Sequence, residues 1–159
     1  MYDSFLTAAF VRNPWSWLAA LYNAVRTSEG HRDQKRVADM SFAEYLDWEI
    51  ARNRRSLLRH VADRDGRIMV DFLGRFENLH EDFVRLCRII GIGPQELPHA
   101  STQRPHADYR EYYDDATRWK VAEHWARDIE TFGYEFDGVT PAGREMRLGR
   151  KDLRRGAIR

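Results

Sequence analysis

A strand signal followed directly by a helix start, near the N-terminus, most constrains how this chain can fold. Residues 8–11 form a short apolar run that is typical of a buried strand. Asn13 suits a helix N-cap, and Pro14 suits the first helical position, because no N–H bond is needed there. A helix is expected over residues 14–27. Arg12 therefore lies at a helix N-terminus, where backbone N–H groups and the helix dipole favour anions.

Length and composition predict one globular domain. The chain has 159 residues, of which 43% are hydrophobic and 13% aromatic. Its 26 basic and 25 acidic residues nearly cancel, so net charge says little about partners. The single cysteine, Cys87, excludes an internal disulfide, and its place on an apolar helix face predicts a core residue. No transmembrane run or signal peptide is visible. We expect a cytoplasmic protein of bacterial type, or a fragment whose targeting segment lies upstream.

The next part of the chain is predicted to be a loop and then helices. Residues 28–39 are polar and predict a loop. Ser41 and Glu44 have capping-box spacing at the start of a helix. A second helical piece is expected over residues 53–61, and residues 63–66 predict a turn.

The middle of the chain predicts a strand and then a helix. Residues 68–73 form a β-branched, apolar run of strand length. Asn78 and Glu81 again have capping-box spacing, and Gly91 suits the end of the helix. Residues 91–113 contain three prolines and predict a long loop. The apolar helix positions expected to face inward are Leu79, Phe83, Leu86, Cys87 and Ile90.

One last helix is expected from Asp114 or Asp115 to Phe132, with Gly133 at its end. Two strands joined through helices imply a parallel α/β arrangement. Two strands are few for a free-standing parallel sheet, so we expect further strands and an exposed edge that promotes oligomers. The positions of the last helix expected to be buried are Trp119, Ala122, Trp125, Ile129 and Phe132.

Three segments, in this order, carry a family resemblance. They are Val11-Arg12-Asn13-Pro14 with its aromatic helix, residues 70–79 with Glu81-Asp82-Phe83, and residues 109–115 running on to 132–136. Over roughly residues 5–136 the chain resembles the sulfotransferases that use 3′-phosphoadenosine 5′-phosphosulfate. The carbohydrate and heparan-sulfate-like subgroup and its bacterial relatives are the most similar.

The resemblance implies the C-terminal portion of a P-loop-like α/β sulfotransferase fold, rich in helices, with a short parallel sheet. Residues 1–138 would be a partial sulfotransferase domain, and residues 139–159 a basic tail with seven basic and two acidic residues. That tail is either a solvated, frayed terminus or a contact for an anionic polymer or membrane surface.

The implied activity moves a sulfuryl group from the nucleotide donor to a hydroxyl, on a carbohydrate by the subgroup resemblance. The family's phosphosulfate loop has no counterpart here, since no Gly-x-x-x-x-Gly-Lys-Thr-like pattern occurs. The family's acid/base residue precedes the Arg12 strand, so we assign no catalytic residue. The six histidines lack metal-ligand spacing, and no metal is expected. The alternatives are an inactive nucleotide- or anion-binding remnant and a basic-tailed interaction module.

Arg12 would contact the 3′-phosphate of the donor, since a guanidinium makes forked bonds to phosphate. The alternative is an arginine that is ion-paired near a helix start. The family has a serine eight residues later, where this chain has Ala20. Ser16, about one helical turn earlier, is the candidate substitute.

A second candidate anion site lies in residues 101–110. Arg104, Tyr109 and Arg110 are candidates for nucleotide binding, and His106 for substrate binding. The alternative is a solvated loop with a structural tyrosine. A further candidate substrate residue, Arg75, follows the second predicted strand, at the end of the sheet where α/β proteins bind ligands. The equally open alternative is that Arg75 and Glu77 form a buried pair that supports the fold.

Overall fold

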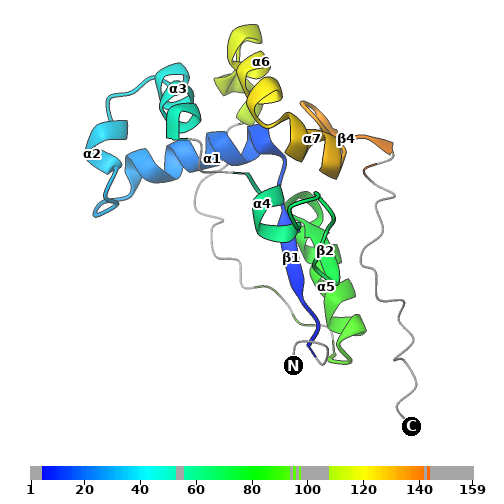
Figure 1. Ribbon diagram of the computed structural model, residues 1–159. Coiled ribbons are helices and arrows are strands. Elements are labelled where there is room, and N and C mark those ends of the chain that lie inside the picture. The colour runs from blue at the N-terminus through cyan, green and yellow to red at the C-terminus, as the bar shows by residue number, and fades with distance from the viewer. Residues whose placement is uncertain are drawn as a thin grey trace. The chain divides into compact units, whose positions relative to one another are not determined.

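A computed structural model describes residues 5–52, 56–93, 95, 97, 108–141 and 143 (Figure 1). The chain divides into two compact units that meet in sequence at Arg12–Asn13. Each is described by itself below. Among the described residues, the strand unit comprises residues 5–12, 57–93, 95 and 97, and the helical unit comprises residues 13–52, 56, 108–141 and 143.

The strand unit is built on a parallel pair of strands. Strands β1 (Ala8–Val11) and β2 (Phe72–Arg75) pair with Ala8 opposite Phe72 and Val11 opposite Arg75. The amide N–H and the hydroxyl of Thr7 both donate to Asp71 Oδ2, at 2.9 and 2.8 Å, and fix the register where the strands begin. The described part of the chain is thus helix-rich α/β with a short two-stranded parallel sheet, as predicted.

The second strand lies further along the chain than its apolar run predicts. Instead of spanning residues 68–73, β2 begins at Phe72, and Ile68 forms an isolated bridge with Ala62. The long-range register set by Thr7 outweighs the local apolar pattern. Arg75 is consequently the last strand residue rather than a residue beyond the strand.

Three helical segments complete the described strand unit: α4 (Leu58–Val61), the 3-10 turn η1 (Phe76–Asn78) and α5 (Leu79–Ile89). Helix α5 packs against β2, and Cys87 is buried as predicted. The predicted capping box at Asn78 is wrong: η1 occupies that turn, and in the described structure the Asn78 side chain makes no cap bond. Ile90 is exposed rather than inward-facing, because α5 ends at Ile89 and Gly91 turns the chain with a φ of 78°.

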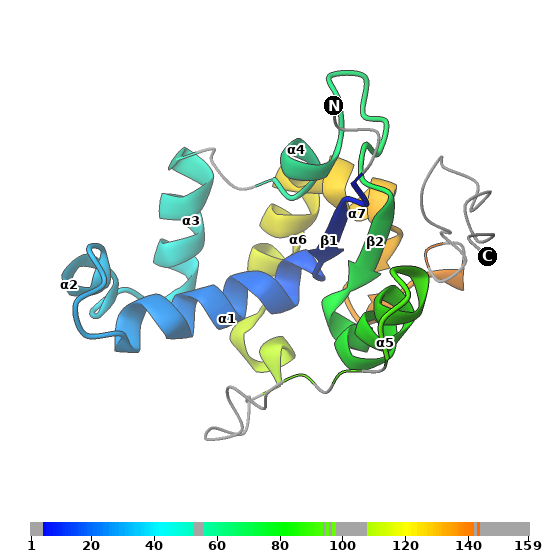
Figure 2. The same cartoon turned by 90° about the horizontal axis from the view of Figure 1, so that it is seen from below.

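The helical unit starts with α1 (Pro14–Thr27), which has the predicted bounds. Helices α2 (Gln34–Val37) and α3 (Phe42–Arg52) both contact α1 (Figure 2). The short helix α2 lies within a predicted loop, and it forms where Val37 is fully buried. The capping box of α3 is confirmed, since Ser41 N–H and Oγ donate to Glu44 Oε2 at 2.8 and 2.7 Å. Of the helical piece predicted over residues 53–61, the structure describes residues 56–61, and only α4 among them is helical.

An aromatic core holds the helical unit together. The ring of Tyr22 packs against Phe42 and Tyr45, with centroids 5.4 and 5.2 Å apart, and Phe42 packs against Tyr113 at 4.8 Å. These rings come from α1, α3 and the segment before the last helices, so apolar contact joins segments that are far apart in sequence.

The rest of the described helical unit contains η2 (Tyr109–Tyr112), α6 (Asp115–His124), α7 (Ala126–Phe132), β3 (Tyr134–Glu135) and β4 (Gly138–Val139). Asp114 caps α6, and Gly133, with a φ of 63°, ends α7 as predicted. Residue 139, where the basic tail was predicted to begin, lies in strand β4. Residues 144–159 lie outside the described residues.

The single helix predicted from residue 115 to Phe132 is in fact broken at Trp125, between α6 and α7. The buried face of α6 runs through Thr117 and Val121, one turn apart. Trp119 lies midway between them, about 200° around the helix from each. It is therefore 62% exposed, and its predicted burial is wrong. No described helix is long and apolar enough to cross a membrane.

Candidate functional site

The carboxyl ends of β1 and β2 bring a cation and an aromatic ring together in the strand unit. Val11 is opposite Arg75 in the parallel register. Arg12 and Phe76 are therefore the residues that directly follow strands β1 and β2. The guanidinium carbon of Arg12 lies over the Phe76 ring, 4.2 Å from its centroid. Phe76 is 46% exposed although it is a large apolar residue. This end of a parallel sheet is where α/β proteins bind ligands.

Arg75 lies at the same end but is only 9% exposed. Its backbone N–H donates to Asp82 Oδ2 at 2.7 Å, which ties the end of β2 to the first turn of α5. Glu77, two residues further on, is exposed in η1. The burial of Arg75 favours support of the strand end over direct contact with a substrate.

Phe76 was missed by the sequence prediction. The predicted strand ends at Leu73, and Phe76 is not among the predicted site residues. The signal that could have found it is the parallel register: a strand ending at Arg75 places the following residue beside Arg12.

The start of α1, in the helical unit, is held in place by Asn13. Asn13 Oδ1 accepts from the N–H groups of Trp15 and Ser16 at 3.0 and 3.4 Å. Its Nδ2 donates to the carbonyl oxygens of Glu135 and Gly138 at 2.9 and 3.3 Å, which ties the helix start to the hairpin of β3 and β4. The predicted N-cap is confirmed, and it also anchors a distant hairpin.

The first turn of α1 contains Ser16, and the next turn contains Ala20; both are half-buried. The backbone here is fixed further by Tyr113, whose hydroxyl donates to the Trp15 carbonyl oxygen at 2.9 Å. Burial raises the pKa of Tyr113 well above its ordinary value, so this hydroxyl stays a protonated donor. The position of the Ser16 side chain is therefore set by a rigid helix start.

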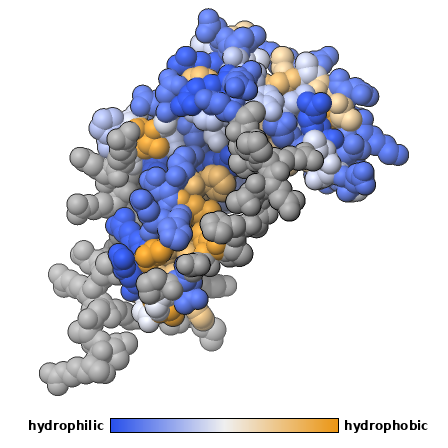
Figure 3. Space-filling model, turned by 180° about the vertical axis from the view of Figure 1, so that it is seen from behind, coloured by the Kyte–Doolittle hydropathy of each residue, from blue (hydrophilic) through white to orange (hydrophobic). Residues whose placement is uncertain are grey.

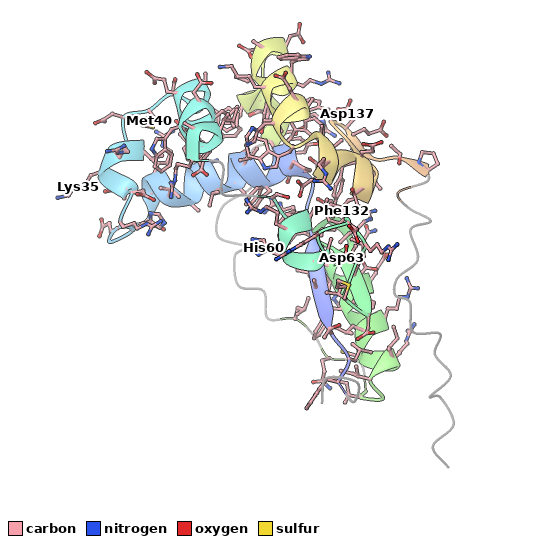
Figure 4. All side chains as sticks on the ribbon, viewed as in Figure 1. Lys35, Met40, His60, Asp63, Phe132 and Asp137 are labelled. Carbon is pink, nitrogen blue, oxygen red and sulfur yellow. The ribbon has the colours of Figure 1, made fainter. Side chains whose placement is uncertain are left out.

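Tyr109 and Arg110 lie in η2 and hold it against the β3–β4 hairpin. The Tyr109 hydroxyl donates to the Phe136 carbonyl oxygen, and the two rings pack edge to face at 5.7 Å. Arg110 donates from Nη1 to Asp108 Oδ2 at 2.9 Å and from Nε to Asp137 Oδ1 at 2.8 Å. Asp137 lies in the turn between β3 and β4 (Figure 4).

The Arg110 ion pairs also set charge states. The Arg110 backbone N–H and guanidinium both bond the Asp108 carboxylate, and they lower its pKa below the ordinary value. Bonds to Asp137 and Asp108 raise the pKa of Arg110 in turn. Arg110 thus bridges two carboxylates, and these contacts favour a positioning role for it.

The predicted site residues fall into three groups. Arg12 and Arg75 lie at one end of the same sheet. Ser16, Tyr109 and Arg110 lie in the helical unit. Arg104 and His106 lie outside the described residues. Within the described ranges, no group of His, Cys, Asp and Glu side chains could hold a metal ion.

Comparison with known proteins bears directly on these strand ends. A family model described as "Sulfotransferase family" matches residues 1–135. A protein of Archaeoglobus fulgidus named "Uncharacterized protein" is 26% identical over 98 residues, which cover 61% of this chain and 76% of the relative. No solved structure matches. The family match includes Arg12, Phe76 and every strand and helix described above except β4, and so this chain belongs to the sulfotransferase family.

Proposed function

We propose that the carboxyl ends of β1 and β2 bind the nucleotide of 3′-phosphoadenosine 5′-phosphosulfate, in transfer of its sulfuryl group to a carbohydrate hydroxyl. The observation that carries this proposal is the Arg12 guanidinium over the exposed Phe76 ring at the strand ends. A guanidinium is planar, and its N–H donors form forked bonds to a phosphate.

The residues at this end fit the two parts of the nucleotide. Arg12 supplies the positive charge that a 3′-phosphate requires, and Phe76 supplies a ring on which an adenine base can stack. Arg75 and its bond to Asp82 stiffen the end of β2 that holds Phe76. In the transfer, the bond between sulfur and the bridging phosphate oxygen breaks, and a bond to the acceptor hydroxyl oxygen forms. The hydroxyl proton passes to a base that we assign to no residue of this chain.

Calorimetric titration of the full chain with 3′-phosphoadenosine 5′-phosphate tests the proposal. Arg12→Ala should weaken binding by roughly tenfold to a hundredfold, because a hydrogen bond to a charged group contributes about 1.5–3 kcal/mol. Adenosine 5′-phosphate, which lacks the 3′-phosphate, should bind more weakly to the wild type and lose little with Arg12→Ala. Arg85→Ala, which removes an exposed arginine of α5, is the matched control. Equal affinity of the wild type and Arg12→Ala would contradict the proposal.

Ser16, in the first turn of α1, is proposed to supply a hydroxyl for nucleotide binding, in place of the serine that the family has at the position of Ala20. Ser16→Ala should then weaken nucleotide binding severalfold. Ala20→Ser serves as the companion variant: if the family position is the productive one, it strengthens binding while Ser16→Ala has no effect. That pattern would assign the phosphate to the second turn of α1 instead.

Tyr109 and Arg110 are proposed to support nucleotide binding from η2, which they hold against the β3–β4 hairpin through Phe136 and Asp137. Arg104 and His106 remain predictions from the sequence, for nucleotide and acceptor respectively. Arg110→Gln should weaken nucleotide binding less than Arg12→Ala does, since Arg110 already bridges two carboxylates.

An inactive nucleotide-binding remnant is the second candidate, and Ala20 in place of the family serine is the feature that favours it. The two candidates differ in one assay. A catalyst transfers labelled sulfate from the donor to a polysaccharide, whereas a remnant binds the donor and transfers none.

The chain is also proposed to self-associate through β1. Within the described residues this strand pairs with β2 alone, and residues 5–11 carry no charged side chain. An uncharged edge strand pairs readily with another chain. Light scattering should show oligomers of the wild type, and Ala8→Lys should shift them toward monomers. A monomeric wild type would rule this association out.

A further inference from the structure

Trp119 is the one large apolar side chain of the described helical unit that is strongly exposed. Its indole makes no hydrogen bond and no ring contact with any residue that the structure describes. By contrast, the rings of Trp15, Trp48 and Trp125 each pack against a neighbouring aromatic ring. The indole of Trp119 is thus largely exposed to solvent, and packing in the core does not explain a tryptophan at this position.

The neighbours of Trp119 on α6 leave room beside the ring. Helical side chains lean toward the N-terminal end of their helix, so the indole covers the turn that contains Ala116. Ala116 at position i−3 and Ala122 at position i+3 are both small. The positions three residues to either side of Trp119 on α6 are therefore filled by small side chains.

Carboxylates flank the ring at one turn on either side. Asp115 at i−4 and Glu123 at i+4 are exposed and share the helix face of Trp119. The cations next to Trp119 in sequence are engaged elsewhere: Lys120 Nζ lies 2.5 Å from Asp47 Oδ1, and the Arg118 guanidinium lies 4.4 Å from the Phe136 centroid. The charge beside the indole is thus negative.

We propose that Trp119, with Asp115 and Glu123, binds a ring of an uncharged carbohydrate. The C–H face of a sugar ring packs on an aromatic face, and hydroxyls at its edge donate to the flanking carboxylates. The two carboxylates disfavour anionic sugars, which selects uncharged ones. The role of this site in sulfuryl transfer rests on the proposed carbohydrate acceptor, which would bind at Trp119 as a second point of attachment. Carbohydrate binding at Trp119 needs no nucleotide.

Titration of the full-length 15N-labelled chain with cellohexaose, an uncharged glucose oligomer, tests this site by NMR. Trp119→Phe identifies the indole N–H signal of Trp119 among those of the five tryptophans. That signal should shift in a saturable manner. Trp119→Ala should weaken binding by roughly tenfold or more, as expected for a central aromatic contact, and Trp119→Tyr should retain most of it. Asp115→Asn combined with Glu123→Gln should weaken binding severalfold.

The matched control is Met69→Ala, which removes an exposed apolar side chain from the strand unit and should leave binding unchanged. Absence of any Trp119 shift at millimolar cellohexaose would overturn the proposal. A change of oligomeric state in Trp119→Ala without loss of sugar binding would also overturn it, in favour of a protein interface. Titration of the same samples with 3′-phosphoadenosine 5′-phosphate separates the two sites, since Arg12→Ala should lose nucleotide binding and keep sugar binding.

Discussion

The two units of this chain are held together in different ways. In the helical unit, side chains cap α1, α3 and α6, and aromatic rings fill the core. In the strand unit, a register clamp at Thr7 and the packing of α5 on β2 hold a short sheet. Apolar side chains reach the surface of the strand unit (Figure 3). Its large exposed apolar residues are Phe5, Leu6, Met69, Phe76, Ile90 and Ile92.

This difference indicates that the helical unit contributes more to stability and that the strand unit offers more surface for binding. Each main helix of the helical unit begins at its own local signal, so this unit is expected to resist unfolding more than the other. The strand unit depends on contacts between distant segments and leaves apolar surface available for ligands or other chains.

The largest expected effect comes from truncating the core of the helical unit. Leu46 of α3 is fully buried, and Leu46→Ala should lower the free energy of unfolding by about 3 kcal/mol because it leaves a cavity. Met69→Ala is the control at an exposed position, where the residue is 65% exposed, and it should change the free energy by less than about 0.5 kcal/mol. Urea denaturation measures both, and similar losses would contradict the account of the helical unit as held together by its buried core.

A smaller loss is expected where the sheet is tightest. A Cβ at Gly74 would lie 2.4 Å from Cε1 and 2.6 Å from Cδ1 of Phe10 on the neighbouring strand. Gly74→Ala should therefore cost about 1–3 kcal/mol, because the ring must move. Adding Phe10→Val should recover part of that loss. Fully additive costs in the double variant would show that the two side chains do not meet across β1 and β2.

The smallest effect depends on pH and belongs to the helical unit. Bonds from the Thr117 hydroxyl and backbone N–H lower the pKa of Asp114 below its ordinary value of 3.8. The unfolded chain therefore binds more protons in this range, so the stabilisation is present above the ordinary pKa and is lost as pH falls through the lowered one. Bonds from the Ser41 hydroxyl and N–H lower the pKa of Glu44 in the same sense.

Thermal unfolding between about pH 2 and about pH 6 measures this dependence. Asp114→Asn should reduce the fall in melting temperature on acidification, and adding Glu44→Gln should reduce it further. An unchanged acid profile in the double variant would mean that other carboxyls carry the pH dependence.

Local signals made the helical unit largely predictable. Asn13, Pro14 and Gly133 are local signals for the helix ends beside them in sequence, and the start of α1 and the end of α7 lie where these residues place them. The break at Trp125 was not predictable, because both halves continue one apolar pattern. The exposure of Trp119 follows from the buried face of α6 set by Thr117 and Val121.

The sequence indicated that the strand unit contains two parallel strands, but it did not indicate which of their residues pair. The apolar run at residues 68–73 indicated a strand, but its bounds depend on Thr7 and Asp71, which are distant in sequence. The same long-range pairing places Phe76 beside Arg12, and no local sequence pattern indicates this contact. Of the candidate site, the cation could thus be predicted, and its aromatic partner could not.

Backbone hydrogen exchange of the full chain, with and without 3′-phosphoadenosine 5′-phosphate, tests the proposed site most directly. Bound nucleotide should slow exchange at residues 11–13 and 75–78, the two segments that meet at the carboxyl ends of β1 and β2. Arg12→Ala should abolish that protection while exchange in α3 stays unchanged. Protection that is absent from both segments, or that persists in Arg12→Ala, would contradict the assignment of nucleotide binding to the strand ends.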